Sequence, residues 1–309
     1  MTELFVKALA LLTFVMIGVL LRNLKILGQA ELKVLPLLVM SLTMPAAMIS
    51  SLSDFVFDAS MMLLVLLGIV SNLLMMAGGW FISRKSSDKD KALTIICSSG
   101  FAISSFVLPY AQEFMGPEVA VSVSVFDAGN AMMVLGLNVI IASHIIKKGQ
   151  HEPGQLKRMS RQLLSSVPFV AVLLMLTLSA LELRLPSPVL STIRMAASAN
   201  TFLAMLMLGT MIDLSSVKER LKSVSRTMVI RYVLCTLMAF LSYRWLPMPQ
   251  TIRFAIVLCF FAPLSSVSPL FVEQLGGDKD DAGLIASISI IIGLVVMSGL
   301  LVSSGGRLG

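Results

Sequence analysis

The sequence is poor in charge and in the residues that build most metal and catalytic sites. Only 13% of its 309 residues are Asp, Glu, Lys or Arg, whereas soluble domains carry about 25%. It has two histidines and three cysteines, and no two cysteines have CxxC spacing. These shortages exclude a disulfide framework and the common zinc and hydrolase motifs. We therefore expect a protein that is not an enzyme, with no catalytic residues, cofactor or metal.

Apolar residues take the place of the missing charge. They make up 57% of the chain, and the mean hydropathy is +0.92. A chain with so little polar surface is solvated by lipid, where helices satisfy their own backbone groups. The sequence thus predicts an all-α polytopic membrane protein. Ten segments are long enough to cross a bilayer: Leu4–Leu21, Val34–Leu52, Met61–Ser83, Leu93–Met115, Val119–Ile146, Leu163–Leu181, Val189–Ile212, Met228–Leu246, Ile252–Leu275 and Leu284–Ser303.

The lysines and arginines, which outnumber the acids to give a net charge of +7, gather in alternate connections. Cytoplasmic connections are enriched in these residues, so both termini are expected outside the cytoplasm. Almost no aromatic residues interleave with the cations, which argues against a nucleic-acid partner. The first, third, fifth and seventh connections hold Arg22, Lys25 and Lys33; Arg84, Lys85, Lys89 and Lys91; Lys147, Lys148, Lys157, Arg158 and Arg161; and Lys218, Arg220, Lys222 and Arg226.

One stretch of the chain occurs twice. Residues 101–116, FAISSFVLPYAQEFMG, align without a gap with residues 261–276, FAPLSSVSPLFVEQLG. A basic segment, residues 147–162, lies between five spans on each side and predicts a cytoplasmic linker between two repeats, 1–146 and 163–309. Because five is odd, the second repeat enters the membrane from the opposite side. Inverted repeats of this kind are typical of secondary transporters.

Serine followed by proline inside an apolar run predicts an interrupted helix in each copy. Proline removes a backbone hydrogen bond, and the unwound segment needs protein or a water-filled cavity around it. The alternative is an ordinary proline kink with serines bonded to their own helix. The candidate binding residues in the two copies are Ser104, Ser105 and Pro109, and Pro263, Ser265, Ser266, Ser268 and Pro269.

Asp127 and Asn130 lie in FDAGN within the fifth span. With Asn138 they occupy an arc of about 80° on a helix, which makes one polar stripe. An acid at membrane depth is costly and usually faces a cavity or a partner. Asp127 is therefore a candidate proton carrier and Asn130 a candidate binding residue. Alternatively, Asp127 is wetted or pairs with Arg194 or Arg231.

Several motifs, in this order and spacing, resemble the auxin efflux carrier family of membrane transporters in its compact bacterial form. They are MIGVLLRNLKIL, SLTMPAAMI, FVLPY, FDAGN, SVPFVAVLL, FLAMLMLGTMIDLS and FFAPLSSVSPLFVEQLGGD. The resemblance implies ten helices in two inverted five-helix repeats, with helices four and nine broken at prolines and crossing in a transport domain. It also implies a bacterial inner-membrane location and a scaffold that allows a homodimer.

The function implied by the resemblance is secondary active efflux of a small organic anion, such as a carboxylate, by alternating access at the crossing. Family members often have asparagine about seven residues before the proline of the fourth span, where this chain has Ala102. Two alternatives are a transporter similar to the bile-acid/sodium symporters and a membrane ligand sensor on the same scaffold. Sodium coupling is not supported, because no acid lies between Phe260 and Phe271.

Overall fold

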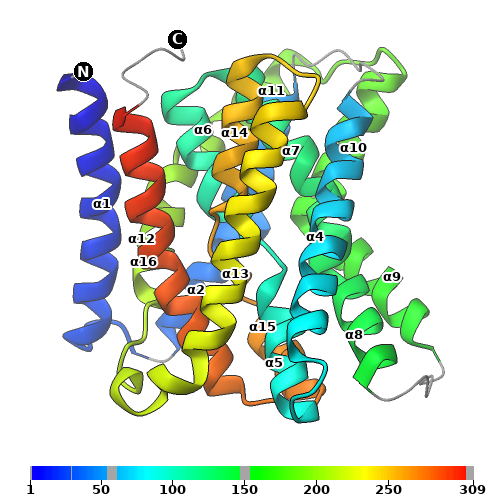
Figure 1. Ribbon diagram of the computed structural model, residues 1–309. Helices are drawn as coiled ribbons and strands as arrows, with labels where there is room; N and C mark the ends of the chain where they lie inside the picture. Colours follow the sequence, from blue (N-terminus) through cyan, green and yellow to red (C-terminus); the bar gives the residue numbers. More distant parts are fainter. Residues whose placement is uncertain (1, 29, 54–60, 147–153, 304–309) are drawn as a thin grey trace.

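The chain is all-helical in the computed structural model, which describes residues 2–28, 30–53, 61–146 and 154–303 (Figure 1). Within these residues the one departure from helices and loops is an isolated β-bridge. The α-helices, and the π-helical turns labelled η, are α1 (Thr2–Asn23), α2 (Glu31–Leu38), η1 (Val39–Thr43), α3 (Met44–Leu52), α4 (Met62–Ser83), α5 (Asp88–Ser98), η3 (Ile103–Val107), α6 (Leu108–Phe114), α7 (Pro117–Met132), η4 (Met133–Leu137), α8 (Asn138–Ile146), α9 (Gln155–Ser165), α10 (Val167–Ala180), α11 (Ser187–Ser198), α12 (Asn200–Met211), α13 (Val217–Trp245), α14 (Gln250–Phe260), α15 (Ser268–Gln274) and α16 (Lys279–Ser303).

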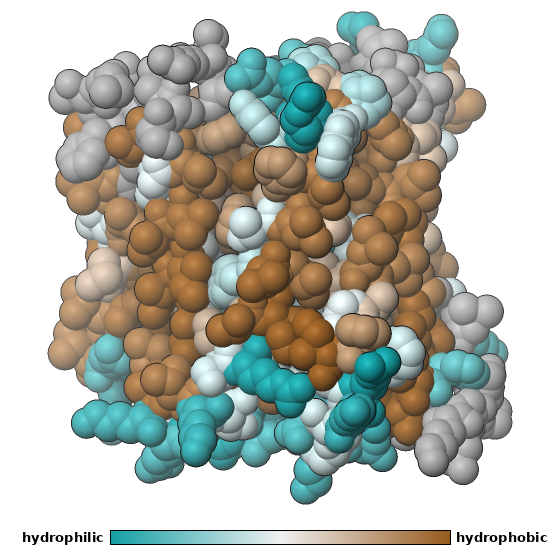
Figure 2. Space-filling view, viewed as in Figure 1, coloured by the Kyte–Doolittle hydropathy of each residue, from teal (hydrophilic) through white to brown (hydrophobic). Residues whose placement is uncertain are grey.

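Six helical stretches among the described residues are long and apolar enough to cross a membrane. They are Glu31–Leu52, Met62–Ser83, Pro117–Ile146, Ser187–Met211, Val217–Trp245 and Lys279–Val302. Hydrophobic side chains form a broad band around the middle of the visible face, and hydrophilic ones gather at its lower edge (Figure 2). The prediction of an all-helical integral membrane protein is confirmed.

The charged connections between helices lie on one side of the molecule. Helices α1, α4 and α12 end at the lower side of Figure 1, where α5 and α13 begin. The basic residues Arg22, Arg84, Lys91 and Arg220 belong to these ends and their links. Helix α1 begins and α16 ends at the upper side. The described basic connections therefore share one face of the molecule.

Two prolines are accommodated by π turns rather than by breaks. Pro45 is the second residue of α3 and follows η1, and Pro109 is the second residue of α6 and follows η3. A proline clashes with the carbonyl four residues earlier, and a wider turn at that point relieves the clash. The prediction that the fourth span breaks at its proline is wrong, because Pro109 lies inside a continuing helical segment.

The predicted linker, residues 147–162, lies partly outside the described residues, which resume at residue 154. From Gln155 it forms helix α9, which continues to Ser165. The sixth predicted span begins at Leu163, but the structure separates α9 from α10 at Ser166, whose ψ is 105°. Pro168 lacks an N–H and its ring would clash with the carbonyl of residue 164, so α9 cannot continue through it.

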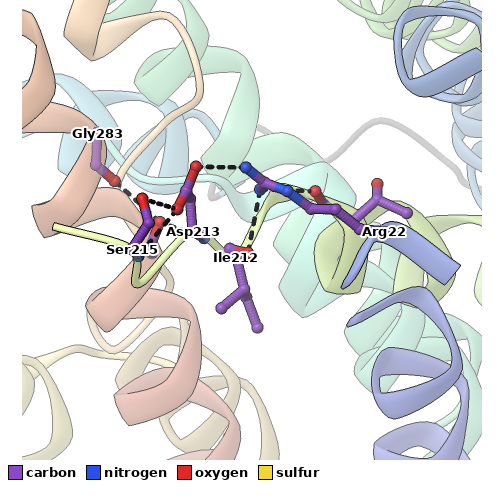
Figure 3. A network of polar contacts seen from close by, with 7 residues as sticks. Arg22, Ile212, Asp213, Ser215 and Gly283 are labelled. Atoms are coloured by element: carbon purple, nitrogen blue, oxygen red, sulfur yellow. Dashed lines mark hydrogen bonds and ion pairs between the residues drawn. The ribbon is translucent and has the colours of Figure 1, made fainter. Parts of the chain in front are cut away.

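A polar network ties α1 to the end of α12 and to α16 (Figure 3). The Arg22 guanidinium donates to the carbonyl of Ile212 at 3.0 Å and forms an ion pair with Asp213. The N–H of Asp213 donates to the Ser287 hydroxyl at 3.0 Å. Hydrogen bonds from Ser215 and the charge of Arg22 hold the pKa of Asp213 below its ordinary value. The pair is consequently ionised at neutral pH.

Helices α1 and α12 approach closely at two glycines. A methyl group at Gly18 would lie 2.2 Å from the carbonyl oxygen of Leu206, and one at Gly209 would lie 2.1 Å from that of Val15. Both separations are far shorter than van der Waals contact. Small residues at such crossings allow membrane helices to pack backbone against backbone.

Gly209→Ala is expected to lower the melting temperature by roughly 2–12 °C, because overpacking costs about 1–3 kcal/mol and each kcal/mol shifts Tm by about 2–4 °C. Thermal unfolding of the purified protein in detergent measures it. Gly299→Ala on α16 is the control, since no atom lies within 4 Å of the added methyl group. Equal melting temperatures for the two variants would contradict the close α1–α12 packing.

Candidate functional site

The first copy of the repeated stretch leaves the helix before its serines. Helix α5 ends at Ser98, and η3 begins at Ile103. Gly100 has a φ of +77°, a conformation that glycine adopts without the steric cost of a side chain. Residues 99–102 are therefore an extended link between two half-helices, α5 on one side and η3 with α6 on the other.

The second copy is interrupted over a longer segment. Helix α14 ends at Phe260 and α15 begins at Ser268. Pro263 lies inside the interruption, as predicted. Pro269 is the second residue of α15, a position where the missing proline N–H has no helical partner to lose. In the ninth predicted span, therefore, the interruption of the helix contains a proline, Pro263.

The two interruptions cross each other as a short antiparallel pair. Phe101 and Leu264 form the β-bridge. The N–H of Ala102 donates to the carbonyl of Pro263 at 2.9 Å, and the N–H of Ser265 donates to that of Gly100 at 3.3 Å. Segments 160 residues apart in the sequence thus satisfy each other's backbone groups at a depth where water does not.

Two buried asparagines bind the remaining polar groups of the first interruption. Asn72 on α4 accepts from the N–H of Gly100 at 2.8 Å. Asn130 on α7 accepts from the N–H of Phe101 at 3.3 Å and donates to its carbonyl at 2.8 Å. The two asparagines also bond to each other at 3.1 Å. On the second interruption, the Ser289 hydroxyl of α16 accepts from the N–H of Leu264 at 2.8 Å.

Arg231 on α13 reaches the crossing from the other side. Its side chain is fully buried, and its guanidinium lies 5.1 Å from the centre of the Phe101 ring. Both terminal nitrogens donate to backbone carbonyls at 3.0–3.3 Å. The acceptors are the carbonyls of Cys97, Ser98, Ser99, Gly100 and Ala262.

A cavity of about 240 Å³ lies against the crossing. Its other walls come from α2 to α3, α7, α10, α12 and α16, and include Met40, Met44, Phe169 and Met207. The predicted site residues that line it are Ser104, Ser105, Asp127, Asn130, Pro263, Ser265 and Ser266. Ala102, the position where asparagine was expected, also lines it. The wall is thus mostly apolar, with a small group of polar side chains at the crossing.

Three predicted site residues lie away from this cavity. Pro109 is buried in α6 within the hydrophobic core. Ser268 is buried beside Gly100, where an added methyl group would lie 3.4 Å from its hydroxyl. Pro269 is half-buried in α15. These residues shape the half-helices but do not face the space where a ligand would bind.

Asp127 is 7% exposed and faces the cavity. Its carboxylate accepts hydrogen bonds from the hydroxyl of Ser104 and from the amide of Asn130, the latter at 2.8 Å. Within the described residues it forms no ion pair with Arg194 or Arg231. Of the acidic side chains in the described ranges, only that of Asp127 lines the cavity.

Sequence reasoning missed the roles of Arg231 and Asn72. The sequence predicts Arg231 only as an alternative partner of Asp127, and Asn72 is not among the predicted site residues. The available signal was an arginine near the start of the eighth apolar span, Met228–Leu246, since charges at membrane depth are rare and usually functional. Among the described residues, no cluster of three His, Cys, Asp or Glu side chains could hold a metal ion.

No protein-family model and no curated protein matches this chain.

Asn130→Ala is expected to destabilise the protein by about 2–4 kcal/mol, because it leaves the N–H and carbonyl of Phe101 without partners in a buried site. Asn138→Ala is a matched control on the same continuous helix, since the Asn138 side chain bonds only to the Ser99 hydroxyl, at 3.1 Å. Thermal unfolding compares the two variants. A loss for Asn130→Ala no larger than that for Asn138→Ala would contradict the role of Asn130.

Proposed function

We propose that the protein is a secondary active transporter for a small organic anion, such as a carboxylate, which binds in the cavity at the helix crossing. The observation that carries the proposal is the crossing of two interrupted helices beside a cavity. Secondary transporters commonly bind substrate near the bilayer midplane, where discontinuous helices expose their ends. The cavity volume is close to the lower end of the about 300–1,000 Å³ of small-molecule sites.

The proposed architecture is two inverted repeats of five helices, as in the auxin efflux carrier family that the sequence resembles. The count of membrane crossings supports this architecture. It reaches ten when α1, α10 and the interrupted pairs α5–α6 and α14–α15 are added to the six long helical stretches. The antiparallel pairing of the crossing also agrees with opposite orientations of the repeats. With the basic connections in the cytoplasm, both termini lie on the extracytoplasmic side of a bacterial inner membrane.

Polar groups that could bind an anion lie on the crossing itself. The hydroxyls of Ser105, Ser265 and Ser266 line the cavity and have no hydrogen-bond partner in the described part of the chain. The N–H groups at the start of η3 belong to a half-helix whose amino end carries positive partial charge. The methionines and Phe169 would contact the apolar part of an organic anion.

The charges near the cavity suggest proton coupling. Arg231 carries one positive charge behind the crossing, and Asp127 carries one negative charge when it is ionised. An ionised Asp127 would repel an anionic substrate, whereas protonation of Asp127 removes that repulsion. Anion and proton would therefore occupy the site together and cross the membrane in the same direction.

Alternating access requires the cavity to face first one side and then the other. Its walls come from two groups of helices: the crossing with α7 and α16, and the group of α2 to α3, α10 and α12. Movement of one group against the other as rigid bodies is the usual way in which repeat-built transporters expose a site alternately. We assign the crossing to the moving group.

Transport is tested with purified protein in proteoliposomes and a panel of labelled carboxylates. The expected result is saturable uptake that accelerates when unlabelled substrate is placed inside the vesicles. Combining Ser105→Ala with Ser266→Ala should reduce this uptake by roughly tenfold or more, since each lost hydrogen bond to a charged group is worth about 1.5–3 kcal/mol. Binding without such counterflow would identify a ligand sensor instead. Unitary currents would identify a channel.

Asp127→Asn is expected to remove the pH dependence of substrate binding. In the wild type, affinity should rise as the pH falls, by up to about tenfold per pH unit where one proton is linked to binding. Isothermal titration at several pH values measures both proteins. Asp213→Asn is the control, because Asp213 lies outside the cavity lining. An unchanged pH profile in Asp127→Asn would exclude Asp127 as the proton site.

A further inference from the structure

Arg231 is a buried cation whose partners are all backbone carbonyls. No carboxylate among the described residues lies within ion-pair distance of it, although its side chain is 0% exposed. An unpaired charge in a protein interior is strongly unfavourable. The five carbonyls at 3.0–3.3 Å must therefore supply the compensation.

Those carbonyls belong to the carboxyl ends of two half-helices. Cys97 and Ser98 are the last residues of α5, Ser99 and Gly100 follow its end directly, and Ala262 lies two residues beyond the end of α14. The carboxyl end of a helix carries a partial charge of about −0.5, from carbonyls that lack helical partners. Two such ends together match the single positive charge of one guanidinium.

A set of unwound carbonyls at a helix crossing is a recognised binding site for a cation. In transporters with discontinuous helices, half-helix carboxyl ends and free carbonyls coordinate the coupling Na⁺ or proton. Here the guanidinium fills that position, and its planar fork of donors suits several acceptors at once.

We propose that Arg231 is the resident cation of the crossing, so that the crossing is stable without a bound sodium ion. Arg231 is a positioning residue: it holds the carboxyl ends of α5 and α14 together from behind, while the cavity lies on the other side. The inference deepens the proposed function, because it removes the need for sodium in transport. It concerns stability first, and it can be tested without a substrate.

The test is the melting temperature of the purified protein in detergent. Wild-type Tm should be the same in sodium chloride and in choline chloride of equal concentration. Arg231→Ala should lower Tm by roughly 10 °C, because it leaves several buried backbone carbonyls without this donor. Arg231→Lys should retain most of the stability because it keeps the charge.

Chemical rescue separates a cation site from a merely structural side chain. Guanidinium chloride at about 50 mM, far below the molar range that unfolds proteins, should raise the Tm of Arg231→Ala by about 3–6 °C, as expected for a ligand at ten times its Kd. Arg226→Ala, on the same helix but with an exposed guanidinium bonded to Ser86 and Ile82, should show no such increase.

Three results would overturn the proposal: stabilisation of the wild type by sodium, an equal response of the two alanine variants to guanidinium, or a lysine variant as unstable as Arg231→Ala. If Arg231→Ala yields no folded protein, the wild-type sodium comparison and Arg231→Lys still decide the matter. Because none of these measurements uses transport, a negative flux assay would leave this inference intact, and failure here would not by itself exclude an anion transporter.

Discussion

The structure depends on the pairing of backbone polar groups that have left the helix inside a membrane. In hydrocarbon, an N–H or carbonyl without a partner costs several kcal/mol. Residues 99–102 and 261–267 are non-helical, and they bond to each other, to Asn72 and Asn130, and to Arg231. Each helix that supplies one of these partners is thereby fixed in position relative to the crossing.

The same pairing determines what remains for a ligand. Asn72 and Ser289 are committed to the backbone, and Asn130 bonds Phe101 and Asp127. The groups that still face the cavity are the carboxyl of Asp127 and a few serine hydroxyls on an otherwise apolar wall. A cavity of this composition offers few polar contacts, and its one acid makes its charge depend on protonation.

Local sequence signals were informative where they broke an apolar pattern. The repeated serine and proline stretch identified both interruptions, and the FDAGN segment identified Asp127 and Asn130 beside them. The sequence was less accurate about what interrupts the fourth span. Pro109 was expected to break the fourth span, yet the break lies at residues 99–102, where Gly100 has a positive φ, and a π turn accommodates the proline. The predicted linker, residues 147–162, has a helical second part, because α9 begins at Gln155.

The amino-acid sequence alone determined that lipid is the solvent, that the fold is helical, and roughly where two helices are interrupted, since these depend on the residues in each local segment. Only the tertiary structure decided which side chains complete the interruptions. Gly100 is bound by Asn72, 28 residues earlier, and by Arg231, 131 residues later. No local pattern specifies such partners, because they are chosen by how the helices pack against one another, and a buried arginine becomes a partner for carbonyls only after two helix ends have been brought together.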